Sequence, residues 1–90
     1  MTNVSEYTVK FGKIARTLVY EDPQGGMLFG FDIEPAKDLS KGKWTLVLER
    51  QPLTLDGKRF ETAIPTERLA TVLERIQNYA TSCGYQVVIQ

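Results

Sequence analysis

The chain has 90 residues, with eleven basic and eleven acidic side chains, one cysteine and no histidine. This length is enough for one domain with one core, and the composition is that of a folded globular protein rather than a disordered one. The balanced charge argues against a protein that binds duplex nucleic acid mainly through phosphates, and the lack of histidine excludes histidine-based triads and metal sites. We therefore expect a single domain over residues 1–90, with a disordered N-terminus at residues 1–5.

The first apolar stretch covers residues 7–20. Tyr7, Val9 and Phe11 alternate with polar residues, which is typical of a half-buried strand. Beyond Gly12 the apolar residues change phase, so a bulge, a bend or a break is expected at that glycine. Residues 22–26 then form a turn containing proline and two glycines, and alternation predicts further strands over residues 27–34 and 44–49.

The next segment contains Asp56-Gly57, a sequence that favours a two-residue type I′ hairpin turn. Phe60, Thr62 and Ile64 alternate with other residues and predict a fourth strand before the helix.

Residues 65–84 carry the long helical pattern of the chain. Its apolar residues recur every three or four positions and define one buried stripe: Leu69, Val72, Leu73, Ile76, Ala80 and Cys83. Thr66 is the expected N-cap, unless Pro65 occupies the first helical position, and Gly84 suits the left-handed position after the last turn. Glu74 and Arg75 lie outside the stripe, so we expect both to be solvated.

Residues 85–89 alternate again and predict a final strand, parallel to the fourth strand or to a neighbour of it. The predicted fold class is α+β. A four-stranded antiparallel meander is followed by one long helix and a last strand (β-β-β-β-α-β), and the helix packs on one face of a curved sheet.

Catalytic chemistry has little support in this sequence. Asp32 and Glu34 share one face of a strand and are more simply its solvated side than paired carboxylates or ligands of a divalent cation. Ser40-Lys41 has no visible partner and is expected from chance adjacency. We therefore predict no catalytic residue, no cofactor and no metal, and a protein that is not an enzyme.

Apolar residues occur on both faces of several predicted strands, as at Val47 beside Leu46 and Val88 beside Val87. One helix covers only about half of one face of a five-stranded sheet, so the chain has more apolar strand surface than its helix can bury. The leading interpretation is a non-catalytic interaction or assembly module, a homodimer or a complex with an unidentified protein partner, formed through the sheet face opposite the helix. Curling of the sheet into a half-barrel is the rival explanation.

The alternative function is single-stranded nucleic-acid binding, because residues 41–60 hold five basic and two acidic residues around an aromatic one. The residues expected to contribute are Lys10, Lys13, Lys41, Lys43, Trp44, Arg50, Lys58 and Arg59. The N-terminus lacks the basic and apolar regions of a signal peptide, and no apolar run is long enough to cross a bilayer. We expect a cytoplasmic protein without membrane association.

Overall fold

The computed structural model describes residues 6–36 and 44–90. It contains five strands and one helix in the order β-β-β-β-α-β, as the sequence predicts. The elements are β1 (Thr8–Phe11), β2 (Thr17–Asp22), β3 (Gly25–Pro35), β4 (Trp44–Leu48), α1 (Thr66–Ser82) and β5 (Tyr85–Ile89). The predicted N-terminal disorder at residues 1–5 lies outside the described residues.

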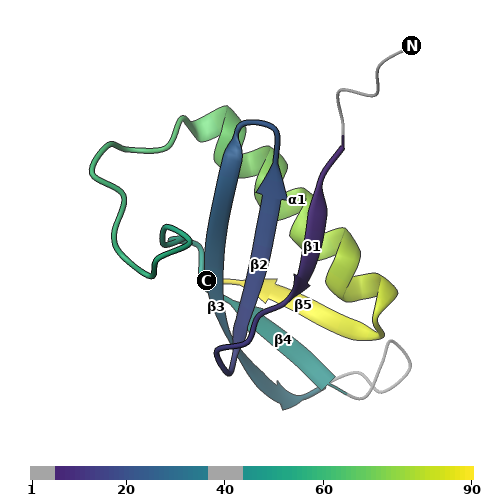
Figure 1. Ribbon diagram of the computed structural model, residues 1–90. Coiled ribbons are helices and arrows are strands. Elements are labelled where there is room, and N and C mark those ends of the chain that lie inside the picture. The colour runs from purple at the N-terminus through teal and green to yellow at the C-terminus, as the bar shows by residue number, and fades with distance from the viewer. Residues whose placement is uncertain (1–5, 37–43) are drawn as a thin grey trace.

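The strands form one mixed sheet in the order β1-β2-β3-β4-β5. The first four strands are an antiparallel meander, and β5 pairs with β4 in parallel. The long strand β3 pairs with β2 over residues 25–30 and with β4 over residues 31–35, so each half of it belongs to a different part of the sheet. Figure 1 shows the result: β4 and β5 cross beneath β1 and β2 at a large angle, and α1 lies behind the bent sheet. The predicted curved sheet with one helix against it is confirmed.

The core lies between α1 and the concave face of the sheet. Among the described residues, eleven buried ones belong to it: Leu18, Tyr20, Met27, Phe29, Phe31, Leu46, Leu48, Val72, Leu73, Ile76 and Ala80. Four of the six residues in the predicted helical stripe are buried in it, and Leu69 packs against it. Cys83 is exposed, so its predicted burial is wrong. Because α1 ends at Ser82, this cysteine no longer lies on the buried face of the helix.

The predicted phase change in the first stretch is a complete break. Residues 13–16 form a turn in which the Gly12 amide donates to the Thr17 carbonyl oxygen at 2.8 Å. Arg16 has a φ of 61° and completes the reversal. The first apolar stretch, over residues 7–20, therefore forms two antiparallel strands, β1 and β2, and not one.

The predicted fourth strand is wrong, because Phe60, Thr62 and Ile64 do not lie in a strand. The segment after β4 instead runs along the edge of β3 opposite β2, where Leu53 and Leu28 exchange backbone hydrogen bonds of 2.8 Å, and the side chain of Leu55 reaches the outer face. Two glycines permit this approach, since a Cβ at Gly26 would come within 2.6 Å of Leu55 and one at Gly30 within 2.8 Å of Glu49.

The predicted type I′ turn is also wrong. The turn is closed by Thr54, whose amide donates to the carbonyl oxygen of Lys58 and whose carbonyl oxygen accepts from Gly57, each at 2.8 Å. Gly57 has a φ of 82°, whereas Asp56 does not have positive φ. This is the pattern of a three-residue loop with glycine in the last position, and not of a two-residue turn with positive φ at both positions.

The start of α1 differs from both expectations. Pro65, rather than Thr66, is the N-cap residue, and no side chain of the described residues caps the helix. The Pro65 carbonyl oxygen accepts the amide of Leu69 at 3.0 Å. At the other end Gly84 has a φ of 95°, as predicted.

The outer face of the sheet is partly covered by the chain itself. Leu28 and Val47, which lie on the face opposite α1, are only 9% and 8% exposed. Bending of the sheet and the segment after β4 therefore account for part of the two-sided apolar pattern within one chain. Among residues 6–36 and 44–90, no helix is both long enough and apolar enough to span a membrane.

Candidate functional site

The basic residues predicted from the sequence are spread over several parts of the molecule. Lys10 lies on β1 and Lys13 in the following turn, and both line a shallow cavity of about 480 Å³ on the outer face, together with Glu21. Arg50, Lys58 and Arg59 belong to the segment between β4 and α1. Lys41 and Lys43 lie outside the described residues.

Trp44 does not share a surface with Lys10. It is the first residue of β4 and lies on the same face of the strand as Leu46 and Leu48, whose side chains face the core. Lys10 pairs across the sheet with Val19, on the outer face. Arg50 donates to the carbonyl oxygen of Gln90 at 3.2 Å, which fixes it at the end of β5. The described residues therefore do not form one basic surface around the indole.

Arg59 borders a second cavity, of about 550 Å³, between the segment after β4 and the start of α1. Apolar residues provide most of its wall: Pro52, Leu53, Phe60, Ala63, Ile64 and Leu69. Glu49 also reaches this cavity, so both signs of charge border it. Asp32, considered above as a cation ligand, forms an exposed ion pair with Arg16 at 2.9 Å.

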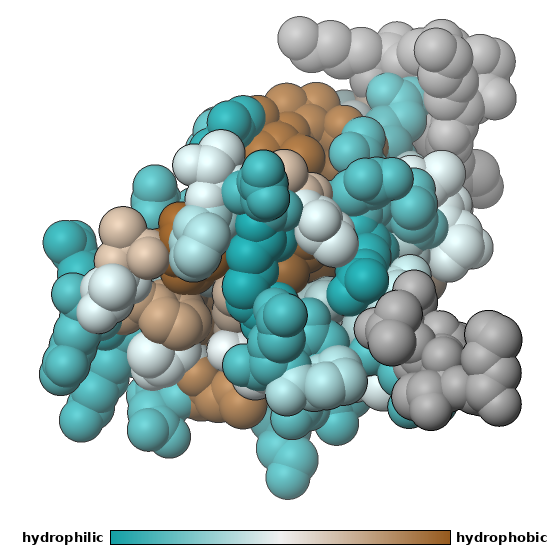
Figure 2. Space-filling view, turned by 90° about the horizontal axis from the view of Figure 1, so that it is seen from above, coloured by the Kyte–Doolittle hydropathy of each residue, from teal (hydrophilic) through white to brown (hydrophobic). Residues whose placement is uncertain are grey.

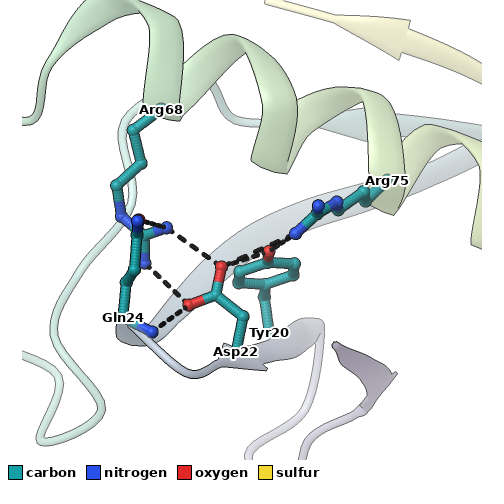
Figure 3. A network of polar contacts seen from close by, with 5 residues as sticks. All are labelled: Tyr20, Asp22, Gln24, Arg68 and Arg75. Atoms are coloured by element: carbon teal, nitrogen blue, oxygen red, sulfur yellow. Dashed lines mark hydrogen bonds and ion pairs between the residues drawn. The ribbon is translucent and has the colours of Figure 1, made fainter. Parts of the chain in front are cut away.

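A buried polar network joins β2 to α1 (Figure 3). The Asp22 carboxylate, whose side chain is 5% exposed, accepts two hydrogen bonds from Arg68, at 2.9 and 3.1 Å. It also accepts the hydroxyl of Tyr20 at 2.6 Å and the amide of Gln24 at 2.9 Å. Arg75 donates to the Tyr20 hydroxyl oxygen at 2.6 Å and lies 3.6 Å from the carboxylate.

The electrostatics of this network favour fixed charges. The hydrogen bonds from Arg68 are the main cause that lowers the pKa of Asp22 to about 2, and Asp22 in turn raises the pKa of Arg68. Burial raises the pKa of Tyr20, so its hydroxyl keeps the proton that it donates to Asp22. Within residues 6–36 and 44–90, every buried side-chain nitrogen and oxygen has a hydrogen-bond partner. A network that is fully satisfied and permanently charged is suited to holding the helix on the sheet.

Arg75 is the residue in this network whose predicted environment is wrong. It was expected to be solvated, but its guanidinium also lies over the ring of Tyr7, at 4.6 Å from the ring centroid. Tyr7 in turn stacks on Tyr20 with centroids 5.9 Å apart. One signal for this role was present in the sequence, because Arg68 and Arg75 are seven residues apart and so lie on the same side of the helix.

A cluster of aromatic rings joins the end of β1 to the start of β5. Phe11 is 42% exposed, and its ring contacts those of Phe31, Tyr79 and Tyr85 at centroid distances of 5.8, 5.9 and 6.4 Å. Tyr85 is also the strand partner of the half-exposed Trp44. Seen from above, apolar side chains reach the surface in several patches separated by hydrophilic ones (Figure 2). The aromatic cluster is one apolar surface that continues directly into β5.

The outer edge of β5 is the second feature of this region. The Gln90 amide donates to the Leu48 carbonyl oxygen at 2.9 Å, so the amides at positions 86, 88 and 90 point towards β4. Because backbone groups alternate along a strand, those of Tyr85, Val87 and Ile89 point away from the sheet. In the described part of the chain, no strand pairs with this side of β5.

The side chains of β5 are exposed in a way that matches an open edge. Val88, on the outer face, is 50% exposed. Val87 and Ile89 face the core but remain partly exposed, whereas their neighbours Leu46 and Leu48 on β4 are fully buried. The strand carries neither a charged residue nor proline, the features with which proteins commonly protect exposed edges.

Comparison with known proteins gives no relative for this chain: no family model, no curated protein and no solved structure matches it.

Proposed function

We propose that the protein is a non-catalytic assembly module that associates with itself through its sheet, using the free edge of β5. The observation that carries this proposal is the edge itself: a strand of five residues, uncharged and without proline, whose outward backbone groups pair with no strand in the described chain. Such an edge is a template for pairing with another strand.

The two other apolar surfaces of the sheet support association less well. On the outer face, Leu28 and Val47 are already buried within the chain. The other edge strand, β1, carries Lys10 and lies against α1, as the contacts of Phe11 with Tyr79 and of Tyr7 with Arg75 indicate. β5 also lies against α1, but it carries no charged residue, and no strand in the described part of the chain pairs with its outward side.

Single-stranded nucleic-acid binding remains the alternative, and the positions of its proposed residues give it less support. Lys10 and Lys13 lie beside Glu21 on the outer face of the sheet, whereas the position of Trp44 in β4 places it on the opposite face. Fluorescence anisotropy with short oligonucleotides across a salt series distinguishes the two functions, because phosphate binding weakens steeply with salt. We expect no salt-dependent binding.

Two matched proline variants test the proposal. Val87 and Val9 each lie on an edge strand, are half-buried against the core and have an amide that points out of the sheet. Proline at either position removes an outward donor without removing a bond of the sheet. We expect light scattering coupled to gel filtration to show concentration-dependent dimers for the wild type and Val9→Pro, and monomers for Val87→Pro. A wild-type monomer up to hundreds of micromolar, or equal dimerisation of both variants, would contradict the proposal.

A further inference from the structure

We infer that the partner of β5 is β5 of a second copy, antiparallel to the first, with Val87 on the two-fold axis. This inference rests on the proposed function and adds the occupant of the edge, its direction and its register. The resulting dimer has one continuous sheet, in which the two copies of β5 are its central strands.

The register follows from which backbone groups point outward. Tyr85, Val87 and Ile89 present their amides and carbonyl oxygens to the open side, as the bond from Gln90 to Leu48 requires. An isologous contact must pair this set with itself in reverse order. Centring on Val87 pairs every outward residue: Val87 with its own copy, and Tyr85 with Ile89 of the second copy. A shift in either direction leaves one outward residue of each strand without a partner.

The side chains brought together by this register are compatible. On the concave side an aromatic residue, Tyr85, lies opposite the aliphatic Ile89 of the second copy, a cross-strand combination that stabilises antiparallel pairs. Val87 lies opposite its own copy. No charged residue lies within Tyr85–Ile89, so pairing with an identical strand brings no like charges together. An edge with lysine in the centre, such as β1 with Lys10, would place like charges near the axis.

The strength of this contact is limited by its length. A pair of five-residue strands buries much less than the roughly 1,200–2,000 Å² of a stable protein interface. We therefore expect a weak dimer that dissociates on dilution.

Cysteine cross-linking tests the register directly. The exposed Cys83 is first replaced (Cys83→Ser), and Gln86→Cys, Val87→Cys and Val88→Cys are then made singly in that background. Residues directly opposite each other in an antiparallel pair have Cα atoms about 4.5–5.5 Å apart, within the range that a disulfide spans. With Val87 on the axis, a cysteine at position 87 meets its own copy, whereas cysteines at positions 86 and 88 do not. Mild oxidation followed by non-reducing electrophoresis measures the yield of covalent dimer.

We expect Val87→Cys to cross-link at least about tenfold faster than the other two variants in buffer, and all three to react equally slowly in urea. Faster cross-linking of Gln86→Cys or Val88→Cys would overturn the register while leaving association through β5 intact. Slow cross-linking of all three, in a protein that light scattering shows to be dimeric, would overturn the edge as the contact. A monomer in light scattering would overturn the proposed function itself. Far-UV circular dichroism of each variant confirms that the fold compared is the same.

Discussion

Arg68, in the first turn of α1, donates two hydrogen bonds to the carboxylate of Asp22, which lies 46 residues earlier at the end of β2. The pair fixes the start of the helix against one end of the meander, and Arg75 adds a second attachment about two turns further along (Figure 3). The other end of the helix leads directly into β5. The start of the helix is thus anchored to β2 and its other end packs against β5, which is the last strand of the sheet.

Removing the charge of Asp22 is expected to destabilise the fold strongly. Asp22→Asn leaves two arginines without their carboxylate in a site that is largely closed to solvent, and breaking such a pair costs about 3–5 kcal/mol. Asp32→Asn is the matched control, because its ion pair with Arg16 is exposed (71% and 65% for the two side chains) and should contribute less than about 1 kcal/mol. Urea denaturation of both variants measures the difference. Equal losses would show that the network does not anchor the helix.

The same carboxylate makes stability depend on pH in acid. Its pKa is about 2 in the folded chain and 3.8 in its unperturbed state, so the unfolded chain takes up the proton first. The stabilisation is fully present above about pH 5 and is lost as the pH falls towards 2. It amounts to about 2 kcal/mol. Urea denaturation at pH 6, 4 and 2.5 should show a steeper loss for the wild type than for Asp22→Asn. Parallel curves would contradict this assignment.

The helix face is tested by a pair of alanine substitutions. Ile76 is fully buried in the core, so Ile76→Ala leaves a cavity and should cost about 2–5 kcal/mol. Glu74, two residues earlier, is exposed, and Glu74→Ala should change the free energy of unfolding by less than about 0.5 kcal/mol. Similar effects of the two changes in chemical denaturation would mean that the helix packs through another face.

Gly57 tests the turn that replaces the predicted type I′ hairpin. Its φ of 82° is unfavourable for a residue with a Cβ, and in the described structure no atom beyond the adjacent residues lies within 4 Å of the place that a Cβ would occupy. The cost of substitution is therefore a backbone cost. Gly57→Val should destabilise the fold by about 1–2 kcal/mol, and Gly57→Asn by clearly less, because asparagine tolerates the left-handed region. Thermal unfolding that shows no difference between valine and asparagine would argue against this backbone conformation.

Local patterns were sufficient to predict the helix and the order of the elements, although residues 7–20 hold two strands and residues 60–64 hold none. The period of the apolar residues from Leu69 to Ala80 identifies the buried face of α1, and alternation identifies the strands. These signals depend on nearest neighbours in one element, which is the information that a sequence carries most directly. The segment after β4 was misassigned because alternation at Phe60, Thr62 and Ile64 describes an extended chain equally well whether or not a strand pairs with it.

The polar network could not be predicted in the same way. From the sequence, Asp22 is expected in a turn and Arg75 on the solvated side of the helix. Only the packing of α1 against β2 brings the guanidinium of Arg75 to 3.6 Å from the carboxylate of Asp22. The edge of β5 depends on strand order, which alternation leaves undetermined. The predicted nucleic-acid-binding residues were grouped by counting charges along the chain. Such a count does not reveal that Lys10 and Trp44 lie on opposite faces of one sheet.

Amide hydrogen exchange measured residue by residue, at a low and a high protein concentration, tests the central claim most directly. Association through the edge of β5 predicts that the amides of Tyr85, Val87 and Ile89 become protected as the concentration rises. The outward amide of Val9 on the other edge should exchange equally fast at both concentrations. Exchange at positions 85, 87 and 89 that stays fast and independent of concentration, in a protein that associates, would contradict the account.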